Sequence, residues 1–393
     1  MKILFVADGR SPTALNWIRY FVEGDHEVHL VSTFDCQPDL ELASLNVLGP
    51  AISAGSAGAG AGDALRRVLP AAARTKLRQI FVPFTLARAA ERLAAMIDAL
   101  QPDLVHAMRI PYEGMLAAQA DPRMPLLVSV WGNDFTLHAP ANARLGRLTR
   151  NTLQRADALH SDCQRDIHLA GLWGFPDDRL RIVLPGAGGI QLDLFHPAEP
   201  AGDRSSVDRV INPRGLRAYV CNEAFFKSIP LVLERKPATK FICPAMAGDP
   251  EPQRWVNQLG IAKHVNLLPV QPRSRMAELF QQAKVVVSPS THDGTPNTLL
   301  EAMACGCFPV VGDLESLREW ITPGVNGLLV DPRSPRQIAD ALLISLTQEN
   351  LLKQARAHNL RLVAEKADYR VVMPRAEQFY KRIVSGRSSA YSI

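Results

Sequence analysis

The sequence predicts an α/β protein with two doubly wound domains, each a parallel sheet with helices on its faces. Short β-branched runs alternate with helical patterns along the chain, and turn residues bound the runs, as in βαβ units. At 393 residues the chain also exceeds the length of one ordinary hydrophobic core. Two domains are therefore expected.

The N-terminal half begins with one such unit. Residues 2–7 predict a strand, 8–13 a loop, 14–22 a helix with one apolar face, and 27–32 the next strand. Similar apolar runs predict three further strands, at 104–107, 126–130 and 158–161. These elements are typical of one doubly wound sheet.

The domain boundary is predicted from composition. Pro, Gly, Asp and Ser cluster between Pro197 and Ser206, as they do in linkers. The expected domains are therefore 1–197 and 198–372, and the second opens with a strand near 207–211.

The most informative stretch is a compact βαβ unit in the second domain. Val285–Val287 form a β-branched strand, and Thr295 is a good N-cap with Pro296 at the first helical position. Gly306 can end the helix in the left-handed conformation before a strand resumes at 308–311.

One carboxylate lies on each side of this helix start. In open parallel sheets ligands bind at the carboxyl ends of strands, so Asp293, Gly294 and the N–H groups at Thr295 should face a crevice that favours phosphate. Glu301 lies among apolar residues, where an ionised carboxylate is costly unless a group such as a ribose diol bonds it. Spacing alone leaves open that Asp293 only initiates a turn and that Glu301 reaches solvent.

The neighbouring sequence carries a family resemblance. After Asp293-Gly294 come Leu-Glu-Ala-Met-Ala-Cys-Gly, Pro-Val-Val, Glu-Trp-Ile, and Gly-Val-Asn-Gly-Leu-Leu-Val-Asp-Pro at 324–332. This series resembles the donor-binding half of the retaining glycosyltransferases of family 4, also called group 1. The resemblance implies the GT-B fold, in which two Rossmann-like domains face each other across a cleft. It also implies a crossover at 181–197 and a C-terminal helix, 373–386, that packs back on the first domain.

The resemblance implies roles for residues of the second domain. The first acid of the family pair touches sugar hydroxyls and the second grips the ribose; these are Asp293, where most relatives have Glu, and Glu301. An Arg and a Lys five positions later neutralise the diphosphate in the family. Arg214 follows a strand and matches phosphate bidentately, but Tyr219 stands at the Lys position, which leaves Arg217 as the nearest substitute. A solvated basic loop is the alternative.

The first domain offers weaker matches. Gly9 stands where relatives have a glycine pair beside the diphosphate, and Arg10 is expected to add charge. Trp131 replaces a frequent family His and is expected to form a wall of the sugar pocket. Asp134 either contacts acceptor or sugar or caps a turn, and His106 either lines the active site or is a satisfied core histidine.

Composition narrows the class of protein. With 47% hydrophobic and 21% charged residues, the chain is typical of globular proteins, and its net charge of +5 is modest. Six scattered Cys indicate reduced thiols in a cytoplasmic protein, and Cys305 and Cys307 are interpreted as packing residues, so no metal site is expected. No apolar run of about 18 residues occurs, so neither a signal peptide nor a membrane span is expected.

Two biased segments precede the predicted strand at 104–107. Residues 53–62 are rich in Gly and Ala and predict a flexible loop. Residues 65–92 interleave basic and apolar side chains, which fits either peripheral contact with an anionic membrane surface or a solvated helical face. No motif indicates nucleic-acid binding.

The sequence thus predicts a retaining glycosyltransferase that moves a sugar from a UDP- or GDP-type nucleotide-diphosphate sugar to a hydroxyl acceptor. The acceptor is expected to be a glycan or lipid-linked molecule of polysaccharide, lipopolysaccharide or other cell-envelope synthesis. No metal or other cofactor is expected. Two alternatives stay open: a nucleotide-sugar 2-epimerase, and a non-catalytic nucleotide-sugar-binding protein.

Overall fold

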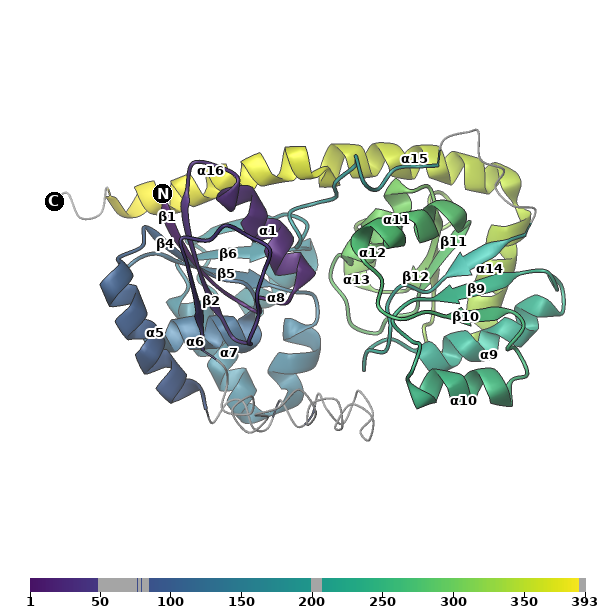
Figure 1. The fold of residues 1–393 in the computed structure, drawn as a ribbon, viewed down its shortest axis with the longest axis horizontal. Coiled ribbons are helices and arrows are strands. Elements are labelled where there is room, and N and C mark those ends of the chain that lie inside the picture. The colour runs from purple at the N-terminus through teal and green to yellow at the C-terminus, as the bar shows by residue number, and fades with distance from the viewer. Residues whose placement is uncertain (49–75, 77–78, 80–84, 199–206, 389–393) are drawn as a thin grey trace. The chain divides into compact units, whose positions relative to one another are not determined.

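The computed structural model describes residues 1–48, 76, 79, 85–198 and 207–388. The Gly/Ala segment at 53–62 lies outside the described residues, as does most of the basic segment at 65–92. The chain forms two compact units (Figure 1). Unit 1 comprises 1–189 and 370–393, and unit 2 comprises 190–369.

Unit 1 contains a seven-stranded sheet in the order β3-β2-β1-β4-β5-β6-β7, and every pair of neighbouring strands is parallel. The strands are β1 (Lys2–Ala7), β2 (Glu27–Ser32), β3 (Ser44–Val47), β4 (Leu104–Ala107), β5 (Leu126–Val130), β6 (Ala158–Ser161) and β7 (Leu180–Val183). The central strands are buried along nearly their whole length, as expected for a parallel sheet covered on both faces.

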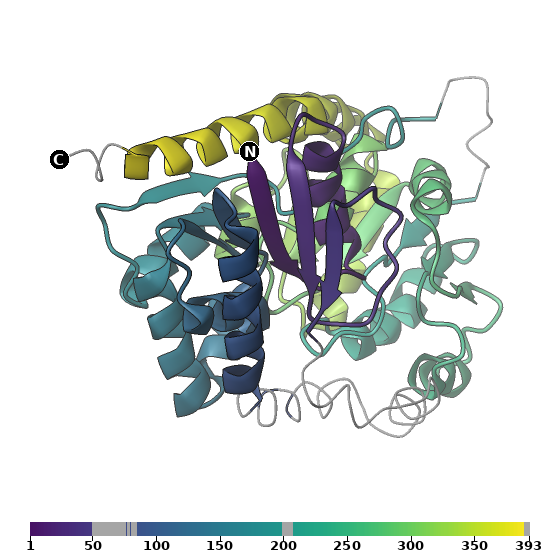
Figure 2. The same ribbon diagram turned by 60° about the vertical axis from the view of Figure 1, so that its left-hand side comes forward.

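The helices of unit 1 begin and end at recognisable signals. Ser11 caps α1 and Pro12 occupies its first turn, so this helix begins two residues earlier than predicted. The described α-helices are α1 (Pro12–Val22), α5 (Leu86–Leu100), α6 (Met115–Ala120), α7 (Ala143–Arg155), α8 (Gln164–Leu172) and α16 (Tyr369–Ser388). All of α16 after its first residue belongs to unit 1 (Figures 1 and 2).

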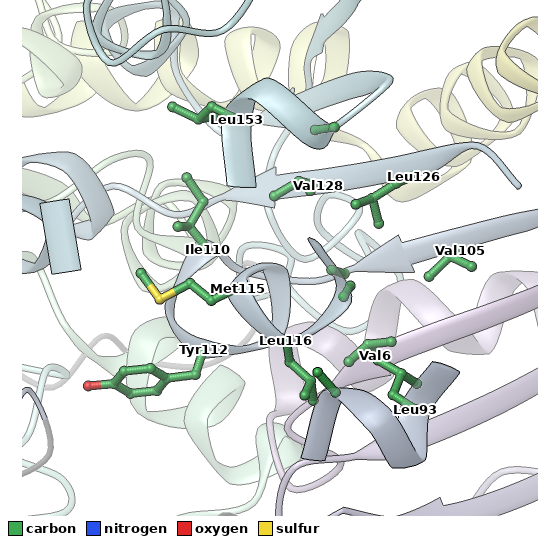
Figure 3. Packing of buried hydrophobic residues seen from close by; sticks show 14 of the residues in the cluster. Val6, Leu93, Val105, Ile110, Tyr112, Met115, Leu116, Leu126, Val128 and Leu153 are labelled. Carbon is green, nitrogen blue, oxygen red and sulfur yellow. The ribbon is translucent and has the colours of Figure 1, made fainter. Parts of the chain in front are cut away.

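The core of unit 1 forms where strands and helices meet. Figure 3 shows Val6, Val105 and Val128 of neighbouring strands, with Leu116 and Leu153 from α6 and α7. All five are at most 2% exposed. Burial of such side chains contributes roughly 1.5–3 kcal/mol each to folding, and it fixes the sheet that carries the loops at its carboxyl edge.

Unit 2 contains a six-stranded parallel sheet in the order β10-β9-β8-β11-β12-β13. Its strands are β8 (Arg209–Ile211), β9 (Lys240–Cys243), β10 (Val265–Leu267), β11 (Val285–Ser288), β12 (Phe308–Gly312) and β13 (Leu328–Val330). Its helices are α9 (Asn222–Leu233), α10 (Pro250–Gln258), α11 (Arg273–Gln282), α12 (Asn297–Ala304), α13 (Glu315–Arg318), α14 (Pro335–Thr347) and α15 (Glu349–Ala367). Two buried apolar clusters hold these elements together.

The boundary between the units falls earlier than the predicted 197–198, between Gly189 and Ile190. The N–H of Ile190 donates to the carbonyl of Ala367 (2.6 Å), and Phe195 is fully buried in a core cluster of unit 2. Most of the predicted linker, residues 199–206, lies outside the described residues. The packing contacts of Ile190 and Phe195 place the residues before it in unit 2.

None of the described helices is both long enough and apolar enough to cross a lipid bilayer.

Candidate functional site

The candidate site in unit 2 is built from two loops at the carboxyl edge of its sheet. β8 and β11 are neighbours in that sheet, so the loops after them meet. The Cys221 N–H donates to the Pro289 carbonyl (2.9 Å), and the Thr291 N–H donates to the Tyr219 carbonyl (2.8 Å). These bonds join the loop that carries Arg214 to the loop that carries Asp293.

A glycine in the adjacent strand makes room for the second loop. A β-carbon at Gly312, the last residue of β12, would lie 2.2 Å from the carbonyl oxygen of Ser290. Side-chain atoms never approach a backbone oxygen so closely. The path of the loop between β11 and α12 therefore depends on a residue without a side chain at position 312.

Arg214 and Asp293 form the centre of the site. An Asp293 carboxylate oxygen lies 2.6 Å from Nη2 of Arg214, and Nη1 of Arg214 donates to the Thr298 hydroxyl at 3.3 Å. Nε of Arg214 is buried and has no hydrogen-bond partner among the described residues. A buried N–H of a charged group without a partner is costly, so this atom is available to an acceptor that the protein itself does not supply.

Arg214 is largely shielded from water. Its side chain is only 8% exposed. Burial alone would lower the pKa of Arg214, but the Asp293 carboxylate and Tyr219 together more than offset this effect and raise the pKa above its ordinary value. Thr298 lies in the first turn of α12, and within the described residues neither its N–H nor that of Gly294 makes a hydrogen bond. The guanidinium and the helix start together favour an anion.

The start of α12 differs by one residue from the prediction. Pro296, not Thr295, is the residue before the first helical position, and the helix begins at Asn297. The Thr295 hydroxyl instead accepts a hydrogen bond from the indole N–H of Trp320 (2.9 Å). This contact draws Thr295 away from the capping position and fixes the loop against the segment after α13.

Glu301 lies on α12 with little compensation for its charge. Its side chain is 14% exposed, and its one ion pair with a described residue is with Arg273, whose Nη2 lies 3.9 Å from Oε1. No hydrogen bond reaches its carboxylate within the described part of the chain. Burial raises its pKa to about 7, although the nearby Arg273 opposes the shift. The carboxylate can therefore accept hydrogen bonds from a ligand.

Arg217 lies on the same loop but differs from Arg214 in its exposure. It is exposed, and its Nε donates to the backbone carbonyl of Arg214 (3.1 Å). Tyr219 contributes its own carbonyl to the loop junction, and its ring centroid lies 6.0 Å from the guanidinium carbon of Arg214. Arg214 is thus the buried cation of this loop, and Arg217 is a solvent-facing one.

In unit 1, the Asp134 carboxylate accepts hydrogen bonds from backbone N–H groups of the protein. The carboxylate is 1% exposed and accepts bonds from the N–H groups of Trp131 (3.1 Å) and Ile110 (3.2 Å) and from Nε of Arg109 (3.1 Å). Burial raises its pKa to about 6 against the effect of these donors. These bonds give Asp134 a structural role, which is closer to the predicted turn cap than to the predicted contact with acceptor or sugar.

His106 belongs to the core of unit 1. It is fully buried, and its two ring nitrogens contact the Tyr380 hydroxyl and the Ser129 hydroxyl. Ser129 continues the chain to His160, whose Nε2 bonds the Leu184 carbonyl (2.9 Å). Of the two alternatives predicted for His106, the structure supports the satisfied core histidine.

Hydrogen-bond logic fixes the protonation of this network. A carbonyl oxygen only accepts hydrogen bonds, so Nε2 of His160 donates to Leu184. In neutral His160, Nδ1 then accepts a hydrogen bond from the Ser129 hydroxyl. His106 then donates to Ser129 and accepts from Tyr380, which in turn accepts from the indole N–H of Trp17 (2.8 Å). Burial lowers the pKa of both histidines, in agreement with this neutral arrangement.

The first loop of unit 1 is held by local contacts. Gly9 is buried, and a β-carbon there would lie 2.4 Å from the Cys36 sulfur. Arg10 is exposed, forms an ion pair with Asp8 (3.0 Å) and stacks over the ring of Phe34 (3.7 Å). The glycine is thus required by packing within the protein, and the Arg10 charge is already paired.

Trp131 and Arg109 lie at neighbouring strand ends of the same sheet. The Arg109 guanidinium carbon lies 5.7 Å from the centroid of the partly buried Trp131 ring. Arg109 adopts a positive φ of 141°, which is unusual for a residue with a side chain. Strained residues of this kind are often found at functional sites.

One group of side chains among the described residues has the spacing of metal ligands. It comprises Asp162, Cys163 and Asp166 in unit 1, at the end of β6. Asp166 is already paired with Arg165 (2.7 Å), and burial raises the pKa of the Cys163 thiol above its ordinary value. A protonated thiol is a poor metal ligand, so this group does not fit a metal ion well.

The predicted residues of unit 2 thus converge more closely than those of unit 1. Asp293, Gly294 and Arg214 share one site, whereas Asp134 and His106 serve the fold of unit 1. The contacts made by Thr298, Arg273 and Arg109 were not predicted. Each follows a strand end or opens a helix, and that position is the signal that could have identified them.

The two parallel α/β units, with the paired loops at a helix start, define a two-domain protein of the GT-B class. Residues 8–186 match the family model for the glycosyl transferase 4-like domain, and residues 225–360 match that for glycosyl transferases group 1. The chain belongs to the group 1 glycosyltransferase family.

Known proteins resemble this chain in sequence and in fold. The D-inositol 3-phosphate glycosyltransferase of Mycobacteroides abscessus is 32% identical over 211 residues, which cover 50% of this chain and 43% of that protein. The chain spans less than half the length of the curated relatives it matches.

Among solved structures, sucrose-phosphate synthase from Thermosynechococcus elongatus has a TM-score of 0.76 at 15% identity and covers 98% of this chain and 100% of its own. Anabaena HepE in complex with UDP has a TM-score of 0.72 at 14% identity and covers 96% and 99%. These similarities establish the fold.

Proposed function

We propose that this protein transfers a sugar from a nucleotide-diphosphate sugar to a hydroxyl group of an acceptor. The observation that carries the proposal is the buried Arg214 guanidinium, whose Nε lacks a partner among the described residues. The guanidinium bonds Thr298 in the first turn of α12, close to backbone N–H groups that also lack partners in the described chain. A diphosphate satisfies all of these donors.

The chemistry follows from this arrangement. The bond between the sugar's anomeric carbon and the diphosphate oxygen breaks, and negative charge develops on that oxygen. Fixed N–H donors and a permanent cation stabilise this charge without reorganisation. The proposed reaction therefore needs no metal ion or other cofactor.

Glu301 is the proposed ribose ligand. Among the described residues, its carboxylate forms an ion pair only with Arg273, at 3.9 Å. The two hydroxyls of a ribose can donate to its two oxygens, and these bonds would offset the cost of burying the charge.

Asp293 is proposed to orient the transferred sugar. Its carboxylate, which pairs with Arg214 at 2.6 Å, is an acceptor of the kind to which sugar hydroxyls donate. The same ion pair makes Asp293 a weak nucleophile. We therefore infer that the anomeric configuration is retained by attack of the acceptor oxygen on the face that the diphosphate leaves, with the hydroxyl proton passing to a phosphate oxygen.

We further propose a UDP-sugar as donor and a glycan or lipid-linked acceptor of cell-envelope or polysaccharide synthesis. HepE, which shares the fold, has been solved with UDP and with UDP-glucose. Another protein of this fold is a lipopolysaccharide outer core galactosyltransferase. These are properties of those proteins, and they motivate the choice of donor and acceptor.

Helix α7 of unit 1 supports peripheral contact with an anionic membrane. It contains no acidic residue, and Arg144, Arg147 and Arg150 are exposed on it. We expect Arg147→Gln/Arg150→Gln to reduce co-sedimentation with phosphatidylglycerol vesicles several-fold, and Arg336→Gln on α14 to leave it unchanged. Equal binding to phosphatidylcholine vesicles would contradict the proposed electrostatic contact.

The donor site is tested by substitutions on its two charges. UDP should raise the melting temperature of the wild type by mass action, and Glu301→Ala should abolish this shift. Arg214→Lys keeps a charge but loses the planar donor set, so kcat for UDP release from UDP-glucose should fall about 100-fold. The exposed Arg235→Lys is the matched control.

The same assay separates this activity from the other predicted functions. UDP release that increases when a glycan acceptor is added supports transfer, whereas release in water alone shows only hydrolysis of the donor. Isomerised sugar without release would indicate an epimerase, and binding without either product would indicate a binding protein. A kcat of Arg214→Lys within threefold of the wild type would refute the proposed role of the guanidinium.

A further inference from the structure

Unit 2 also contains a concave site at the carboxyl ends of β11, β12 and β13. The cavity has a volume of about 440 Å³, within the range of small-molecule pockets. Its polar wall includes His292, Asp313, Asp331, Arg333 and Gln337. We call it the β12–β13 pocket.

Hydrogen bonds to neighbouring groups of the protein fix the polar side chains of this pocket. Both oxygens of Asp313 accept from Arg318 at 2.7 Å. Oδ1 of Asp331 accepts the Arg333 N–H (3.0 Å), and the Asp331 N–H donates to Oε1 of Gln337 (2.9 Å). Side chains fixed in this way are preorganised for a ligand.

Three residues of the pocket also have polar atoms that make no hydrogen bond within the described chain. Oδ2 of Asp331, the amide NH₂ of Gln337 and the guanidinium of Arg333 make no hydrogen bond within the described chain. The pocket therefore offers acceptors and donors together. Hydroxyl groups need this combination, because each can donate one hydrogen bond and accept others.

The remaining wall is apolar and includes Leu314, Leu329 and Pro332. Such a surface suits the C–H face of a sugar ring. Two carboxylates disfavour an anion, and no group of potential metal ligands that includes them is suitably spaced among the described residues. These features make a neutral hydroxyl-bearing ligand a better match than an anion or a metal ion.

We propose that the β12–β13 pocket binds a carbohydrate ring, at a site separate from the donor nucleotide. Thr291 and His292 line the pocket and directly precede Asp293, which pairs with Arg214. The two sites are thus connected by one loop. The inference rests on the pocket's own side chains, and it does not require that the proposed donor be correct.

The proposal is tested by saturation-transfer NMR on the full chain with UDP present. The probes are glucose, galactose, N-acetylglucosamine and myo-inositol, each measured separately. We expect at least one to bind the wild type. Asp331→Asn/Gln337→Ala should weaken that binding about tenfold because two hydrogen-bonding groups are lost. Asp340→Asn, an exposed change on the same helix α14, is the matched control.

Two results would overturn the proposal: no saturation transfer to any probe, or the same dissociation constant in the double variant as in the wild type. Arg333→Gln provides a second variant if the first alters the fold. The dissociation constant for UDP is measured in parallel. It should be unchanged in the double variant, whereas its loss in Glu301→Ala reports on the donor site alone.

Discussion

Glu301 is a largely buried carboxyl group whose charge is disfavoured in the free protein. Burial raises its pKa to about 7, so the ionised form is disfavoured in the free protein. A carboxyl group whose pKa is raised by folding destabilises the folded state as the pH rises from the pKa in the unfolded chain towards the pKa in the folded protein. A ligand that donates hydrogen bonds to the carboxylate removes this cost.

Nucleotide binding should therefore be linked to proton release from Glu301. We expect UDP affinity to rise about tenfold between about pH 6 and pH 8 through this group, and Glu301→Gln to lose that part of the dependence. Titration calorimetry at several pH values measures it. The nucleotide's own phosphate titrates in the same pH range. The readout is therefore the difference in the pH dependence of UDP affinity between wild type and variant. Parallel pH profiles would show that Glu301 does not contact the ligand.

At the scale of elements, the site depends on how closely the loop after β11 passes β12. The Ser290 carbonyl occupies the space that a side chain at Gly312 would need, at 2.2 Å. The same loop reaches Asp293 three residues later, so local crowding here displaces the partner of Arg214.

We expect Gly312→Ala to destabilise the protein by about 1–3 kcal/mol through overpacking and to reduce UDP binding. Gly171→Ala is the matched control, because a β-carbon on this exposed residue of α8 would meet nothing within 4 Å. That change should stabilise the helix by up to about 1 kcal/mol. Urea unfolding measures both, and equal effects would contradict the packing argument.

Most elements could be predicted because local sequence determines them. The strand predicted at Val285–Val287 is observed as Val285–Ser288, and Gly306 ends α12 with a φ of 83°. β-branched runs buried on both faces and a glycine after a helix are signals within a few residues. The predicted start of α12 was wrong because Trp320, distant in sequence, engages Thr295.

The site could be predicted only in part for the same reason. The rule that ligands meet strand ends located Asp293 and Arg214. It could not reveal that these two residues pair with each other, or that the partner of His106 is Tyr380, 274 residues away. Contacts of this kind depend on tertiary packing, which no local pattern reports.

At the scale of the whole molecule, the buried network ties α16 to the sheet of unit 1. Tyr380 links Trp17 of α1 to His106 of β4, and the chain of bonds continues to His160 of β6. Both histidines are neutral in the folded protein, whereas the unfolded chain binds protons below about pH 6.5. Stability is therefore lost as the pH falls through that value.

We expect the free energy of unfolding to fall by about 1 kcal/mol per buried histidine between about pH 6.5 and pH 5.5. His160→Gln should be less stable near neutral pH but should show a shallower dependence on pH. His168→Gln, on the exposed surface of α8, should retain the wild-type slope. Denaturant unfolding at each pH provides the test, and an unchanged slope in His160→Gln would contradict it.

The first and last residues of unit 2 are joined by hydrogen bonds. Ile190 bonds both Ala367 and Tyr369, at 2.6 and 3.0 Å. Unit 2 is consequently one uninterrupted insertion whose beginning and end are adjacent, while unit 1 is assembled from two separated pieces of chain. Exchange of unit 2 between homologues would need only two junctions, and these lie next to each other. The donor specificity proposed for unit 2 would then be transferred with it as a whole.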